Sequence, residues 1–111
     1  MSDALGSVSV FRALGDPTRC QVVARLSRGR ATASELAAPF SMALPSFMQH
    51  LGVLEDCGVV RSHKRGRVRT YWLDSERLAG AEAWLTAQRR EWDERADRFE
   101  EYIAGLDEGS R

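Results

Sequence analysis

Apolar residues recur at helical spacing near the start of the chain. They lie three or four residues apart, as on one face of an α-helix, at Ala4, Val8, Phe11 and Leu14. Gly15 follows directly, and glycine most easily takes the left-handed conformation that ends many helices. The pattern predicts a short first helix that ends in a left-handed cap at Gly15.

Two capping signals predict the next two helices. Asp16 followed by Pro17 is typical of an N-cap and a first helical position, so a second helix is expected over about residues 17–28. Thr32 and Glu35 have the spacing of a capping box, in which each side chain accepts a hydrogen bond from the other residue's backbone N–H. A brief third helix is therefore expected directly after Thr32.

A fourth helix is indicated by an apolar face formed by Phe47, Leu51 and Leu54. Pro45 fits its first turn, and Gly58 fits its C-terminal cap. The small and polar residues of this segment fall largely off the apolar face, so we expect them to be exposed.

After the predicted fourth helix, the helical spacing of apolar residues gives way to runs typical of β-strands. β-Branched and aromatic residues dominate residues 59–63 and 68–73, and the charged segment 64–67 between them contains Gly66. This pattern predicts a β-hairpin with a basic tip.

A long final helix is predicted from Asp74 and Ser75, which provide an N-cap. Apolar residues then recur every seven positions, at Leu78, Leu85, Trp92, Phe99 and Leu106. The neighbouring stripes are mixed in character, so the helix is expected to pack on a partner without forming a complete coiled-coil seam.

Together these elements predict one domain over residues 1–111, mainly helical with a small β-hairpin. With 111 residues and 43% apolar side chains, the chain suits a single core and is too short for a two-domain enzyme. Residues 33–57 fit a helix-turn-helix, residues 59–73 its wing, and residues 75–104 a long C-terminal helix. This is the plan of a winged helix-turn-helix, with four helices, two strands and a last helix.

Such a fold suits double-stranded DNA, because a helix fits the major groove and a basic hairpin reaches the flanking backbone. The residues expected to face the groove are Leu44, Ser46, Met48 and Gln49, with His50 at its margin. The residues expected to contact phosphates are Lys64, Arg65, Arg67 and Arg69. A charged turn can also serve only to prevent edge pairing, but directly after a helix-turn-helix it favours DNA.

A formal net charge of zero argues, taken alone, against a nucleic-acid partner. The charge is unevenly distributed, however. Residues 41–73 carry five bases against two acids, whereas residues 74–111 carry eleven acids against six arginines. The segment expected to face DNA is therefore basic, and the acidic excess lies on the last helix.

Four segments taken together resemble the ArsR-type family of bacterial winged-helix repressors, namely residues 11–19, 33–37, 49–60 and 66–73. The resemblance extends over about residues 8–104. It implies a homodimer held by the first and last helices, an imperfect palindrome as operator, and repression of the protein's own operon. The residues expected at the dimer interface are Val8, Phe11, Leu85, Trp92, Phe99 and Ile103.

The chain departs from this family at the metal-sensing positions. Residues 35–39 contain no cysteine where metal-sensing members carry a Cys-x-Cys pair, and the two histidines, His50 and His63, lie in or beside the DNA-reading region. We therefore expect no metal site and no cofactor. Met48 stands where the family commonly has serine, which leaves the base contacts open.

The cysteines and one tryptophan admit two readings. Cys20 and Cys57 fit helix positions where small apolar residues pack, which we favour over a redox switch. Trp84 lies off the seven-residue stripe, which leaves open a pocket for a small-molecule effector.

Two other functions are less well supported. A winged helix that binds protein through its acidic last helix is the main alternative. An enzyme is not expected, because no nucleophile motif, phosphate loop or metal cluster is visible. The absence of a leader or a long apolar stretch predicts a cytoplasmic location and no membrane contact.

Overall fold

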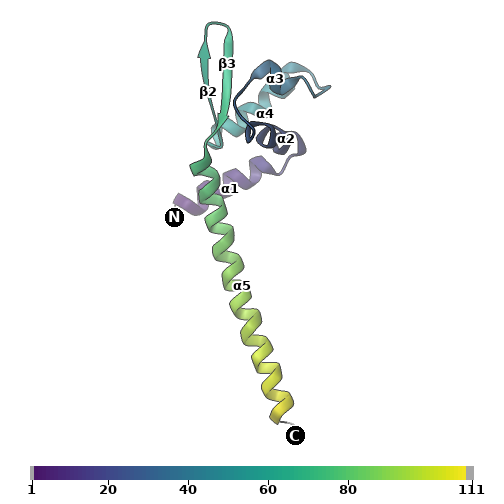
Figure 1. The fold of residues 1–111 in the computed structure, drawn as a ribbon, viewed down its shortest axis with the longest axis vertical. Coiled ribbons are helices and arrows are strands. Elements are labelled where there is room, and N and C mark those ends of the chain that lie inside the picture. The colour runs from purple at the N-terminus through teal and green to yellow at the C-terminus, as the bar shows by residue number, and fades with distance from the viewer. Residues whose placement is uncertain (1, 110–111) are drawn as a thin grey trace. The chain divides into compact units, whose positions relative to one another are not determined.

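The computed structural model describes residues 2–109, with side chains over residues 6–107. The helices are α1 (Ser2–Leu14), α2 (Pro17–Leu26), α3 (Ala33–Ala37), α4 (Leu44–Asp56) and α5 (Ser75–Gly109), and the strands are β1 (Ala31–Thr32), β2 (Val60–Arg65) and β3 (Val68–Leu73) (Figure 1). The predicted winged helix-turn-helix is confirmed. The side chain of Ala4, part of the first predicted stripe, lies outside the described side chains.

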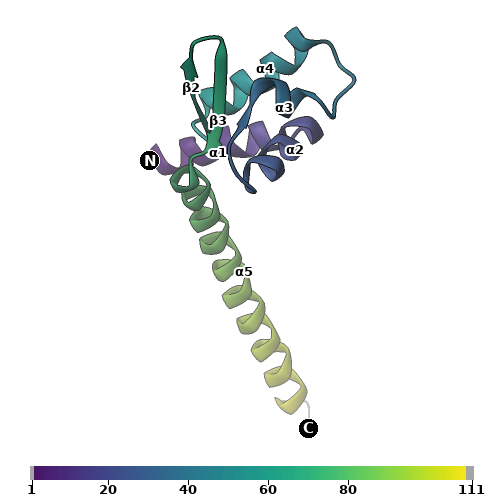
Figure 2. The same cartoon turned by 45° about the horizontal axis from the view of Figure 1, so that its top comes forward.

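The chain divides after Ala81 into two compact units. In the first unit, α1, α2 and α4 pack against one another, and α3 packs against α4 and β3 (Figure 2). Their shared core contains the predicted apolar face of α4, since Phe47, Leu51 and Leu54 are all buried. Tyr71 of β3 is the largest fully buried side chain, so the sheet contributes directly to the core.

The sheet has one strand more than the sequence analysis predicted. Its order is β1-β3-β2, and both pairings are antiparallel. Strand β1 has only two residues, which pair with Tyr71 and Thr70. A two-residue strand carries no alternating pattern, so only its tertiary pairing reveals it.

The hairpin turn is tighter than expected. Strand β2 continues to Arg65, which pairs with Val68, so only Gly66 and Arg67 form the turn. Gly66 has a φ of 64°, at the first turn position, where a type II′ turn takes glycine. Lys64 therefore lies in the strand, opposite Arg69.

The predicted N-terminal caps are confirmed. The Asp16 carboxylate accepts a hydrogen bond from the Arg19 backbone N–H at 3.0 Å. Thr32 and Glu35 form both hydrogen bonds of the capping box. Asp74 caps α5 by accepting from the Glu76 backbone N–H at 3.1 Å.

The predicted left-handed cap at Gly15 is wrong. The positive-φ residues of the described chain are Gly29, Gly58 and Gly66, so Gly58 takes the predicted role but Gly15 does not. The last carbonyls of α1 instead accept hydrogen bonds from the Arg19 guanidinium, as shown below. A cationic side chain at a helix C-terminus removes the need for a left-handed residue.

The second unit, from Glu82 onward, consists of the remainder of α5. Its large apolar residues are exposed, among them Leu85, Trp92, Phe99 and Ile103. Among the described residues, no helix is long and apolar enough to cross a membrane.

Candidate nucleic-acid interface

The N-terminal half of α4 exposes most of the residues expected to face DNA. Phe47, Leu51 and Leu54 hold the helix against the core. The side chains of Leu44, Ser46, Met48 and Gln49 are all exposed. Because the buried anchors fix the helix, these four side chains are presented on a rigid element.

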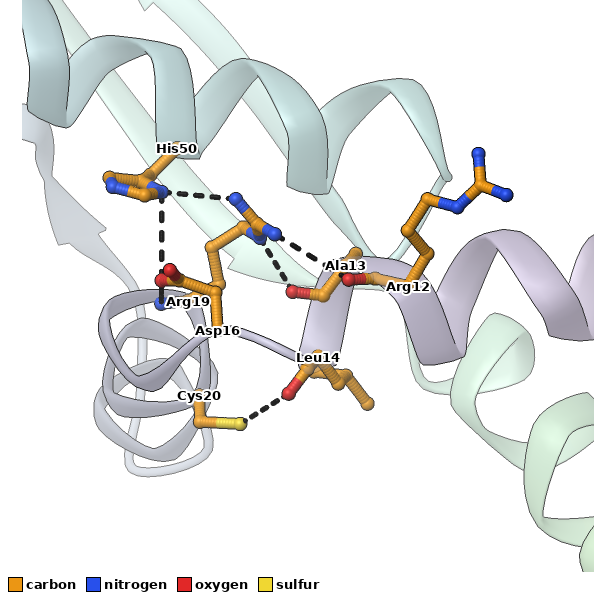
Figure 3. Close-up of polar contacts among 7 residues, drawn as sticks. All are labelled: Arg12, Ala13, Leu14, Asp16, Arg19, Cys20 and His50. Atoms are coloured by element: carbon orange, nitrogen blue, oxygen red, sulfur yellow. Dashed lines mark hydrogen bonds and ion pairs between the residues drawn. The ribbon is translucent and has the colours of Figure 1, made fainter.

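His50 is placed differently from its neighbours on α4. Its side chain is only 23% exposed, and its Nδ1 atom lies 3.1 Å from Arg19 Nη1 and 3.6 Å from Asp16 Oδ2 (Figure 3). Asp16 and Arg19 belong to the junction between α1 and α2. Helix α4 is therefore joined through His50 to Asp16 and Arg19, and we call these three residues the junction cluster.

Arg19 also secures the end of α1. Its Nε–H donates to the Ala13 carbonyl at 2.6 Å, and its Nη2 donates to the Arg12 carbonyl at 3.5 Å (Figure 3). The pKa of Asp16 is lowered, first because the Arg19 backbone N–H donates to the carboxylate. One arginine thus ties three helices together, α1, α2 and α4.

The tip of the wing is cationic and unpaired. Lys64, Arg65 and Arg67 are exposed, and none of the three forms an ion pair with the described acidic residues. Three free cations on a short hairpin give a local positive field that the zero net charge of the chain conceals.

Arg69, the fourth cation predicted to contact phosphates, is half-buried and is hydrogen-bonded within the protein. Its Nη1 donates to the Ser62 hydroxyl at 2.7 Å, and that hydroxyl donates to Glu55 Oε1 at 3.0 Å. Glu55 lies in the last turns of α4, and Ser62 and Arg69 lie in β2 and β3. This chain of hydrogen bonds connects the wing to α4.

Two further contacts hold the base of the wing. Arg61 Nε donates to Asp74 Oδ2 at 2.8 Å, and this hydrogen bond is the main cause of the lowered pKa of Asp74. The Arg30 guanidinium lies over the Trp72 ring, 4.7 Å from its centroid. These contacts and those of Arg19 could not be predicted from the sequence, because each joins segments that are separate in the chain.

The cysteines are separate and free. Cys57 packs beside the core, as expected, and its thiol donates to the Leu54 carbonyl. Cys20 is exposed, so its predicted packing role is wrong; its thiol donates to the Leu14 carbonyl at 2.8 Å. Cys20 lies two residues before buried Val22, which at about 100° per residue is the opposite face of α2.

The described part of the chain contains no group of three or more His, Cys, Asp or Glu side chains that could hold a metal ion. The residues expected at a dimer interface are mostly accessible. Val8, Leu85, Trp92, Phe99 and Ile103 are exposed, whereas Phe11 is half-buried against the core.

Comparison with known proteins agrees with this geometry. The helix-turn-helix domain family matches residues 14–63. The transcriptional repressor SdpR of Bacillus subtilis (strain 168) is 32% identical over 77 residues, which cover 69% of this chain and 86% of SdpR. The crystal structure of an ArsR family transcriptional regulator is 55% identical in sequence and superposes with a TM-score of 0.76. The match covers 79% of this chain and 97% of the chain of that regulator.

The chain belongs to the ArsR family of transcriptional regulators. It is a DNA-binding regulator, and the family is one of regulators rather than enzymes. An ArsR-like regulator from Rhodococcus sp. RHA1 is also similar, with 31% identity, coverage of 89% of this chain and 93% of its own, and a TM-score of 0.77. The chain spans only 59% of the length of CmtR of Mycobacterium tuberculosis, with which it shares 37% identity over 70 residues.

Proposed function

We propose that this ArsR-family chain is a homodimeric repressor that binds an inverted-repeat operator in the cytoplasm. In each protomer, α4 lies in the major groove and the tip of the wing lies on the flanking phosphates. The observation that carries the proposal is that one compact unit contains both an exposed start of α4 and a cationic hairpin tip that forms no ion pair with the described acidic residues. That SdpR is a repressor supports the direction of regulation.

Individual roles follow from position and chemistry. Ser46 and Gln49 donate and accept hydrogen bonds at base edges, and Leu44 and Met48 suit the thymine methyl groups. Lys64, Arg65 and Arg67 contact phosphates, which position the protein without reading sequence. Arg69 supports the wing through its hydrogen bond to Ser62. Only the N–H groups of Arg69 that this hydrogen bond leaves free contact the DNA backbone.

The dimer is supported by the exposed apolar residues of α5. Large side chains such as Trp92 and Phe99 are 70% and 65% exposed in the single chain. A monomeric soluble protein rarely exposes several large apolar side chains along one helix, so we expect a second copy of the chain to bury them. Two-fold symmetry then places the recognition helices about 34–36 Å apart, one turn of DNA.

The test is a titration of fluorescent duplexes. A duplex from the region upstream of the coding sequence, with an inverted repeat, is compared with a shuffled duplex of the same length at moderate salt. We expect binding to the first to be about a thousandfold tighter or more. Equal binding to both duplexes would contradict the proposal and favour the alternative of a winged helix that binds protein through its acidic last helix.

A further inference from the structure

The Nδ1 atom of His50 faces two groups that make opposite demands on it. An Arg19 guanidinium nitrogen lies 3.1 Å away, and an Asp16 carboxylate oxygen lies 3.6 Å away. Guanidinium is only a donor, so a hydrogen bond from Arg19 requires a lone pair on Nδ1. Carboxylate is only an acceptor, so a hydrogen bond to Asp16 requires a proton on Nδ1. The two hydrogen bonds exclude each other.

The distances decide between them. At 3.1 Å the Arg19 contact lies within hydrogen-bond range, and at 3.6 Å the Asp16 contact lies outside it. The guanidinium is also held in place by its 2.6 Å hydrogen bond to the Ala13 carbonyl. The carboxylate already has a donor of its own, the Arg19 backbone N–H at 3.0 Å. These contacts favour Nδ1 as the acceptor, which leaves Nε2 to carry the ring proton.

Figure 3 shows the second ring nitrogen on the side of the imidazole away from Arg19. We propose that Arg19 is a positioning residue that holds His50 as its neutral Nε2–H tautomer, and that this N–H donates to a phosphate oxygen of DNA beside the recognition helix. This inference rests on the proposed function only in its second half. Its first half concerns the free protein.

A neutral donor has a distinctive effect on DNA binding. Each cationic contact releases counterions and steepens the fall of affinity with salt, by about 0.9 in the log–log slope. A neutral N–H adds a hydrogen bond but releases no counterion. Loss of the His50 donor should therefore weaken binding equally at every salt concentration, whereas loss of a cation would also reduce the slope.

Two substitutions separate the two sides of the ring. In His50→Asn the amide oxygen can lie near the position of Nδ1 and accept from Arg19, but the NH2 group does not reach the position of Nε2. In His50→Gln the amide reaches the position of Nε2, so it offers the outward donor but has lost the Arg19 contact. We expect His50→Asn to weaken operator binding about fivefold to tenfold with an unchanged salt slope. We expect His50→Gln to stay within about threefold of the original affinity.

The opposite order of affinities would overturn the phosphate contact by a neutral His50. So would a salt slope reduced by about two in His50→Asn, because the dimer would then have lost one cationic contact in each protomer. Thermal melting of both variants shows whether either loss of affinity merely follows unfolding.

Nitrogen NMR of the free protein tests the tautomer independently of DNA. At neutral pH we expect His50 to show a proton on Nε2 and none on Nδ1. In Arg19→Met, which removes the donor, both tautomers should become populated. A proton on Nδ1 in the unaltered protein, alone or together with one on Nε2, would overturn the assignment and favour an ion pair with Asp16. Because no DNA is present, this result is distinct from any failure of the proposed function.

Discussion

At the scale of single residues, Ser62 connects the recognition helix to the wing through one hydroxyl group. It accepts from Arg69 and donates to Glu55 at the same time. Glu55 and Arg69 are both half-buried, so loss of the hydroxyl leaves two charged groups with a missing partner.

Ser62→Ala should lower the free energy of unfolding by about 1 kcal/mol in urea denaturation. Ser34→Ala, at an exposed position of α3, is the matched control and should change it by less than about 0.5 kcal/mol. Equal effects of the two substitutions would show that the hydroxyl bridge carries no stability.

Asp16 predicts a dependence of stability on pH. Its pKa is lower in the folded chain than its ordinary value, so it binds its proton less tightly when folded. Its charge therefore stabilises the fold above the unfolded pKa, and this contribution disappears as the pH falls through the folded pKa.

Asp16→Asn keeps an N-cap, since asparagine caps helices as well as aspartate, but removes the charge. The variant should melt at a lower temperature than the original protein at neutral pH and at nearly the same temperature near about pH 2. If the difference in melting temperature were the same in acid, the lower stability of the variant would come from a weaker N-cap and not from the lost charge.

At the scale of elements, the wing acts as a cationic hairpin whose base is fixed and whose tip is free. Arg61 and Arg69 are engaged at the base, whereas Arg65 and Arg67 are not paired with any described acid. Within the wing, the cations at the tip are therefore expected to replace most of the counterions on DNA.

Substitution of both Arg65 and Arg67 by alanine removes four cations from the dimer, two from each wing, and should reduce the slope of log operator affinity against log salt by about three to four. Substitution of Arg90 and Arg98, two exposed arginines of α5, removes the same charge and should leave the slope unchanged. An unchanged slope in the wing variant would show that the tip does not contact DNA.

The elements also show what the sequence could reveal about this fold. The caps at Asp16 and Thr32 and the apolar face of α4 were predictable, because each depends on residues within a few positions. The end of α1 was not, because the Arg19 side chain replaces a left-handed glycine. The junction cluster joins residues 31 positions apart, and no local pattern encodes such a contact.

At the scale of the whole molecule, α5 determines the state of association in our proposal. Trp92 and Phe99 lie seven residues apart and are largely exposed, whereas Glu94 falls on the opposite side of the helix.

Trp92→Glu combined with Phe99→Glu should shift the protein from dimer to monomer in sedimentation velocity and weaken operator binding. Glu94→Ala is the control and should remain dimeric. A double variant that still sediments as a dimer would place the interface elsewhere.

The central claim is that two copies of this chain read one operator through α4 and the wing. Hydroxyl-radical footprinting on the upstream duplex, with the stoichiometry of the complex measured alongside, tests it most directly. We expect two protected half-sites one helical turn apart, about 34–36 Å, with two chains bound. Uniform protection along the duplex, or a single protected site with one chain bound, would contradict the claim.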